Sequence, residues 1–101
     1  MKRRHVAFTK TAREHVRAAK QWWIENSLRP EILVREIEDA VSLPSVLPGA
    51  GSIYAKADVP SLRRVYLRRL TSHLYYTFTD DEVVIQALWH ANRKHGPELE
   101  S

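Results

Sequence analysis

The chain has 101 residues, of which 44% are hydrophobic and 28% charged, a composition that suits one compact domain and leaves no room for a second. It contains no cysteine, which excludes disulfides and thiolate chemistry and agrees with a cytoplasmic location. The formal net charge of +4 favours anionic partners. The apolar run after Met1–His5 is too short for a signal peptide or a membrane span, so no membrane association is expected.

The N-terminal part of the chain predicts one short strand followed by a helix. Residues 4–9 alternate loosely with β-branched and aromatic side chains, a pattern typical of a strand. Thr11 followed by Glu14 matches a capping box, so a helix is expected to begin at Thr11. Its apolar residues recur at helical spacing and form one stripe: Ala12, Val16, Ala19 and Trp23.

A second helix is predicted to begin at Pro30, because proline is favoured at the first helical position. We expect it to end at Leu43, since the residue before a proline disfavours the helical conformation. Its apolar stripe comprises Leu33, Ile37, Ala40 and Val41. Helices joined by so short a connection form an antiparallel hairpin.

The second half of the chain carries strand patterns throughout. Residues 62–70, 73–79 and 82–90 predict a three-stranded antiparallel meander. The last of these strands is apolar on both faces except for Gln86 and His90, which are expected to share a face, so it is predicted to be an interior strand. The expected fold is therefore α+β, with an N-terminal strand and a helical hairpin packed on a mostly antiparallel sheet.

The chain is expected to form a single domain over residues 1–101. Residues 94–101 carry no strong strand or helix pattern and are predicted to be a loosely held tail.

The positive charge is concentrated in the first strand of the meander. Residues 59–79 contain four arginines and no carboxylate, so this segment carries the whole net charge and the rest of the chain sums to zero. Alternation along a strand places Arg64, Tyr66 and Arg68 on one face, where guanidinium and phenol groups suit phosphate or carboxylate. The predicted partner-binding residues are Arg63, Arg64, Tyr66, Arg68 and Arg69. The alternative is a solvated face without a partner.

A catalytic reading of the same region depends on His90. If the protein is a nuclease, His90 moves a proton while Arg64, Arg68 and Arg93 neutralise a phosphate. The alternative is that His90 only hydrogen-bonds a neighbouring strand or turn. The other histidines are too scattered along the sequence to suggest a metal site, and no motif predicts a cofactor.

The order of these motifs resembles the RelE/ParE superfamily of toxins from bacterial type II toxin-antitoxin modules. The segments that carry the resemblance are Ala12 with Trp22–Trp23, Pro48–Gly51 with Tyr54, Leu62–Leu67, Leu74–Tyr76 and Ala87–Arg93 before Pro97. The similarity extends over nearly the whole chain.

The resemblance implies a growth-inhibiting toxin that a cognate antitoxin neutralises by wrapping around it in a hetero-oligomeric complex. Members divide between ribosome-dependent mRNA endonucleases of the RelE branch and DNA gyrase inhibitors of the ParE branch. The double tryptophan and the ending Leu88–Trp89–His90–Ala91 are closer to the ParE branch, so gyrase is the favoured target and ribosome-bound mRNA the alternative. A second alternative is a basic protein-binding module without toxicity.

Overall fold

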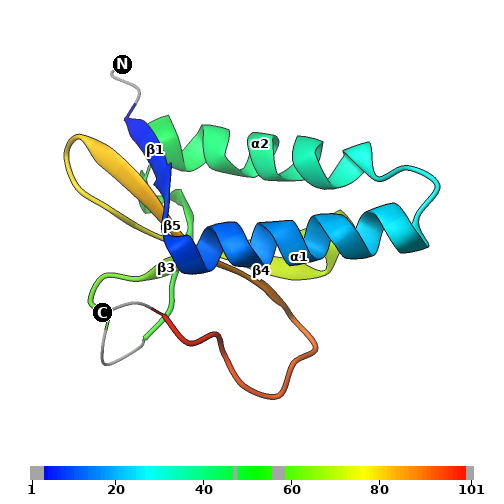
Figure 1. The fold of residues 1–101 in the computed structure, drawn as a ribbon. Coiled ribbons are helices and arrows are strands. Elements are labelled where there is room, and N and C mark those ends of the chain that lie inside the picture. The colour runs from blue at the N-terminus through cyan, green and yellow to red at the C-terminus, as the bar shows by residue number, and fades with distance from the viewer. Residues whose placement is uncertain (1–3, 47, 56–58, 100–101) are drawn as a thin grey trace.

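The computed structural model describes residues 4–46, 48–55 and 59–99 and has an α+β architecture (Figure 1). Its elements are β1 (His5–Phe8), α1 (Lys10–Asn26), α2 (Glu31–Val46), β2 (Ser52–Ile53), β3 (Arg63–Leu67), β4 (Ser72–Phe78) and β5 (Glu82–His90). The strands form one sheet with the order β1-β5-β4-β3-β2. Strand β1 runs parallel to β5, whereas the other neighbours are antiparallel. The predicted fold class, including the interior position of β5, is confirmed.

The first helix begins earlier than predicted. Thr9, not Thr11, is the N-cap, and its hydroxyl accepts a hydrogen bond from the Ala12 backbone N–H at 3.0 Å. The same hydroxyl donates to the Gln86 carbonyl at 3.3 Å, and the Thr9 N–H donates to the Ile85 carbonyl at 3.0 Å. These bonds to β5 fix the point where β1 ends, so the sheet rather than the local capping motif sets the helix start.

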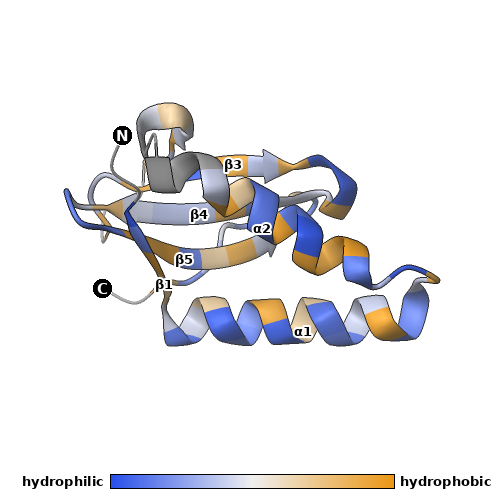
Figure 2. Ribbon diagram, turned by 90° about the horizontal axis from the view of Figure 1, so that it is seen from above, coloured by the Kyte–Doolittle hydropathy of each residue, from blue (hydrophilic) through white to orange (hydrophobic). Residues whose placement is uncertain are grey.

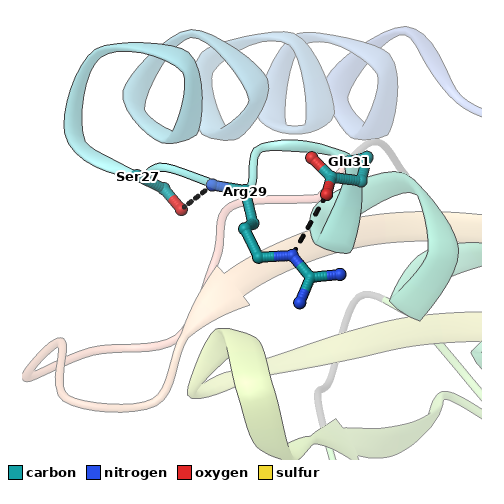
Figure 3. A network of polar contacts seen from close by, with 3 residues as sticks. All are labelled: Ser27, Arg29 and Glu31. Carbon is teal, nitrogen blue, oxygen red and sulfur yellow. Dashed lines mark hydrogen bonds and ion pairs between the residues drawn. The ribbon is translucent and has the colours of Figure 1, made fainter.

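The second helix continues past Pro44 to Val46, so the predicted end at Leu43 is wrong. Proline disfavours the helical conformation of the preceding residue without forbidding it, and it removes one hydrogen bond of the helix. In the connection between the helices, the Ser27 hydroxyl accepts from the Arg29 N–H at 3.0 Å and the Arg29 guanidinium contacts Glu31 at 3.2 Å (Figure 3). Hydrogen bonding by its own backbone N–H and then by Arg29 lowers the pKa of Glu31.

Both helices pack on one face of the sheet. Their predicted apolar stripes are confirmed: Ala12, Leu33 and Ile37 are buried, and the other members of the two stripes pack against them. The sheet contributes the buried residues Leu67, Leu74, Tyr76, Val83, Ile85 and Leu88 to this core. Apolar and hydrophilic stretches accordingly alternate along α1 (Figure 2).

A second, smaller core lies on the opposite face of the sheet. Its buried residues are Val59, Leu62, Tyr75 and Ala87, with Tyr54, Trp89 and Leu99 packed against them. Pro97 is almost fully buried, and the Trp89 indole N–H donates to the His95 carbonyl at 2.8 Å. Residues 94–101 are predicted to be a loose tail; in the described part of this segment, His95, Pro97 and Leu99 make contacts with the rest of the chain.

Strand β3 is shorter than predicted because the chain turns at residues 68–71. Leu67 pairs with Ser72, so these four residues must connect β3 to β4. Arg68–Leu70 form a 3₁₀ turn, and Thr71 adopts a left-handed conformation with φ 48°. The prediction that Arg68 continues the strand is therefore wrong.

Strand β5 contains a bulge at Gln86. Tyr75 pairs with Ala87 while the next residue, Tyr76, pairs with Ile85, which leaves Gln86 as the extra residue. The bulge shifts the alternation by one position, so Gln86 and His90 do not share a face as predicted. Gln86 instead donates to the Thr77 hydroxyl at 3.0 Å.

Candidate functional site

A pocket of about 180 Å³ lies on the face of the sheet that the helices leave uncovered. The sheet supplies its floor, and the segment after β5, orange to red in Figure 1, supplies one wall. The basic residues that line it are Arg64, His73, His90, Arg93, Lys94 and His95. No carboxylate from the described part of the chain lines it, so the pocket suits an anion.

Arg64 is held by aromatic rings on the floor of this pocket. Its guanidinium lies over the Tyr54 ring at 4.6 Å and 6.0 Å from the centre of the Tyr75 ring. One of its N–H groups donates to the Tyr75 hydroxyl at 3.3 Å. Stacking of this kind fixes the plane of a guanidinium and leaves N–H groups at its edge available to a ligand.

Arg93 repeats this arrangement on the wall of the pocket. Its guanidinium lies 3.9 Å from the centre of the Trp89 ring. The hydrogen bond from Trp89 to the His95 carbonyl holds that ring in place. Two guanidinium groups on separate segments are thus each positioned by an aromatic side chain on the same face of the sheet.

The His73 ring contacts two tyrosine rings: the distance between ring centres is 5.2 Å to Tyr66 and 6.1 Å to Tyr75. Partial burial, and then the positive charge of Arg64, lower the pKa of His73 from its usual value. This shift favours the neutral imidazole, so His73 offers the pocket hydrogen-bonding groups more than charge.

His90 lies at the end of β5, where its Nδ1 accepts a hydrogen bond from the Asn92 N–H at 3.2 Å. This contact is the turn-forming role that was the alternative to catalysis. The acceptor at Nδ1 places the proton of neutral His90 on Nε2, and the side chain is exposed at the pocket rim.

The structure brings together three of the four residues predicted for a nuclease: Arg64, His90 and Arg93 line the pocket. Arg68 is exposed on the turn after β3 and does not line it. His73, Tyr54, Lys94 and His95 were not predicted as site residues. Lys94 and His95 belong to the segment predicted to be a loose tail, and no sequence pattern links Tyr54 or His73 to Arg64.

The predicted partner-binding arginines do not form one surface. Arg64 and the exposed Tyr66 lie on the pocket face. Arg63 donates to the carbonyls of Gly49 and Gly51 at 3.2 and 2.6 Å, so it secures the turn before β2. Arg69 contacts Glu36 of α2 at 3.5 Å.

A larger hollow of about 680 Å³ lies between the second half of α1 and the end of the sheet. Trp22, Trp23, Leu33 and Leu88 supply much of its apolar lining, and 57% of the Trp22 surface is exposed. Arg93 lines both this larger hollow and the basic pocket, so the two meet at the turn after β5.

Within the described residues, no group of three or more potential ligand side chains is placed to hold a metal ion, and no helix is long and apolar enough to cross a membrane.

The fold is similar to that of a chain in a solved structure titled "Chromosomal ParDE TA system from P. aeruginosa". The superposition has a TM-score of 0.66 at 17% sequence identity and covers 86% of this chain and 95% of that chain. The sequence matches no family profile and no curated protein. The likeness establishes the fold that the resemblance to the RelE/ParE superfamily implied.

Proposed function

We propose that the protein is the toxin of a type II toxin-antitoxin module, that it acts in the cytoplasm by binding DNA gyrase, and that a cognate antitoxin neutralises it. The observation that carries the proposal is the fold likeness to a chain of a ParDE system over 95% of that chain's length. The sequence features closest to the ParE branch, including Trp22–Trp23, support gyrase as the target.

The local geometry favours binding over catalysis. Acid–base catalysis of RNA cleavage requires a proton acceptor beside the phosphate contacts. His90 accepts a backbone hydrogen bond with Nδ1, and the guanidinium groups of Arg64 and Arg93 lie against aromatic rings. These interactions build a rigid basic surface, which is what a binding protein needs.

A second candidate is a ribosome-dependent mRNA endonuclease. It is favoured by the convergence of Arg64, His90 and Arg93 on one pocket. In this mechanism the Asn92 N–H contact opens so that Nδ1 of His90 carries the ring proton. Nε2 can then accept a proton while the arginines stabilise the charge on the phosphate.

Two assays on the purified protein separate the candidates: supercoiling by DNA gyrase and cleavage of mRNA on programmed ribosomes. We expect gyrase inhibition with intact mRNA, relieved by the antitoxin, and we expect His90→Ala to inhibit gyrase as well as the unmodified chain does. Ribosome-dependent cleavage that His90→Ala abolishes, with gyrase still active, would establish the nuclease instead. Harmless overexpression of the folded protein without antitoxin would favour the non-toxic binding module.

A further inference from the structure

The basic pocket has the chemistry of a carboxylate-binding site. We propose that it binds an acidic peptide segment of a protein partner, with the guanidinium groups of Arg64 and Arg93 and the ammonium group of Lys94 as the recognising groups. This inference rests on the proposed function, because the partner that we assign to the basic pocket is the antitoxin that neutralises the toxin.

The charge around the pocket is uncompensated. The guanidinium group of Arg63 donates to turn carbonyls, and that of Arg69 contacts the Glu36 carboxylate. By contrast, Arg64, Arg93 and Lys94 line a pocket whose described lining includes no carboxylate. The partner must therefore supply the negative charge, and charge-assisted hydrogen bonds to guanidinium groups would form the contacts.

The aromatic rings favour a carboxylate over a nucleotide. Proteins that bind single-stranded nucleic acid stack bases on free aromatic faces. Here the guanidinium of Arg64 covers a face of Tyr54, and that of Arg93 covers a face of Trp89. A base stacking on either of these faces would have to displace an arginine, whereas a carboxylate needs only the guanidinium edge, which the stacking leaves accessible.

The C-terminal segment makes the pocket a defined site rather than an open sheet face. Trp89 fixes the His95 carbonyl, and Pro97 is buried beyond it. The close fit at Gly96, where an added Cβ would lie 2.6 Å from the Tyr54 hydroxyl, brings this wall against the floor that carries Arg64. The segment therefore limits how far an acidic peptide can extend across the sheet.

The test measures binding of defined probes to the intact chain by calorimetry at low ionic strength. The probes are the peptide acetyl-Leu-Glu-Asp-Glu-Leu-amide, its counterpart with Gln and Asn in place of the acidic residues, and a six-nucleotide oligothymidylate. We expect the acidic peptide to bind, to weaken as salt is raised, and to shift the NMR signal of the Trp89 indole N–H. Equal binding of the uncharged peptide, or tighter binding of the oligonucleotide, would overturn the proposal.

The exposed residues Arg93 and Lys94 allow a variant that should leave the fold intact. We expect the double substitution Arg93→Gln and Lys94→Gln to weaken acidic-peptide binding by about tenfold or more, and Arg64→Gln to act in the same direction. The double substitution Arg13→Gln and Arg17→Gln removes two charges from the exposed side of α1; it is the matched control and should retain the affinity. Unchanged affinity in both pocket variants would disprove the site.

Failure of the proposed peptide site can be distinguished from failure of the proposed toxin function. A wild-type chain that neither inhibits gyrase nor arrests growth would contradict the toxin assignment, while salt-sensitive peptide binding lost in the Arg93, Lys94 variant would still support the pocket. Gyrase inhibition by a chain that fails to bind the acidic peptide would contradict the pocket alone.

Discussion

The hydroxyl of Tyr76 joins the centre of the sheet to the turn before β2. Tyr76 is fully buried, and its oxygen accepts a hydrogen bond from the Gly51 N–H at 2.9 Å. Burial raises the pKa of this hydroxyl, although the bond from Gly51 and the charge of Arg63 act in the opposite direction. Tyr76→Phe leaves a buried N–H without its acceptor, so we expect a loss of about 1–3 kcal/mol in urea unfolding.

The space around Gly51 provides a second test of this contact. A Cβ at residue 51 would lie 2.5 Å from the Tyr76 hydroxyl and 3.0 Å from the Arg64 carbonyl, whereas one at Gly49 meets nothing within 4 Å. We therefore expect Gly51→Ala to lower the midpoint of urea unfolding clearly and Gly49→Ala to change this midpoint little. Equal effects of the two substitutions would mean that the turn is not packed on Tyr76 in solution.

We expect His15 to make the stability of the fold depend on pH. Its Nδ1 accepts a hydrogen bond from the Leu88 N–H at 3.3 Å, which requires a neutral imidazole. Burial, and then the charge of Arg93, lower the pKa of His15 in the folded state, while Glu14 opposes the shift. The unfolded chain thus binds the proton more readily, so this contribution to stability is complete above about pH 6.5 and is lost as the pH falls through the folded pKa.

The variant His15→Asn isolates this effect, because asparagine can accept the Leu88 hydrogen bond without titrating. We expect the free energy of unfolding of the variant to fall less steeply between neutral and mildly acidic pH than that of the wild type. His73, whose pKa burial and Arg64 also lower, leaves a residual slope in both proteins. Identical slopes would show that His15 does not couple proton binding to folding.

At the scale of single elements, Thr9 connects the start of α1 to β5. Its hydroxyl caps the helix through the Ala12 N–H and also contacts the Gln86 carbonyl. We expect Thr9→Ala to cost about 1–2 kcal/mol in thermal or urea unfolding, while Thr9→Ser, which keeps the hydroxyl, should recover most of this loss. A loss of similar size in both variants would assign the effect to the threonine methyl group instead of the cap.

The elements that could be predicted from sequence are those with strong periodicity. The apolar stripes of both helices and the bounds of β5 were predicted correctly from the sequence. Burial of these residues in one core imposes a regular spacing on them. Three errors fall where tertiary contacts override local patterns: the start of α1 after its N-cap Thr9, the end of β3 at Leu67 and the bulge at Gln86. The predicted end of α2 at Leu43 is wrong for a local reason, because a proline disfavours the preceding helical residue without forbidding it. A bulge moves the side chain of every later residue in the strand to the opposite face of the sheet. No residue type near Gln86 indicates a bulge.

The candidate site was predictable in its charge but not in its composition. The arginine-rich segment pointed to Arg64, and the end of β5 pointed to His90 and Arg93. Tyr54 and His73 belong to the pocket only because neighbouring strands and loops bring distant segments together. The contribution of residues 94–96 depends on the residues that follow, since Pro97 is buried and Leu99 packs on the second core. Local sequence does not indicate either contact.

The whole molecule depends on a sheet that is covered on both faces. The helices cover one face, while the second core on the other face is closed by residues 95–99. We expect a chain ending at Lys94 to lose about 2–4 kcal/mol of unfolding free energy, since the truncation exposes apolar surface and removes the Trp89 hydrogen bond. The same truncation removes a wall of the basic pocket and should weaken acidic-peptide binding even where the chain remains folded.

The substitution Glu98→Gln provides the control for this truncation. Glu98 is exposed and does not line the pocket, so the change should leave both stability and peptide affinity unaltered. Circular dichroism during urea unfolding reports the stability, and calorimetry with the acidic peptide reports the affinity. If the truncated chain matched the full chain in both measurements, residues 95–99 would not pack on the sheet in solution. The second core would then be open to water, and the pocket would reduce to the sheet residues around Arg64.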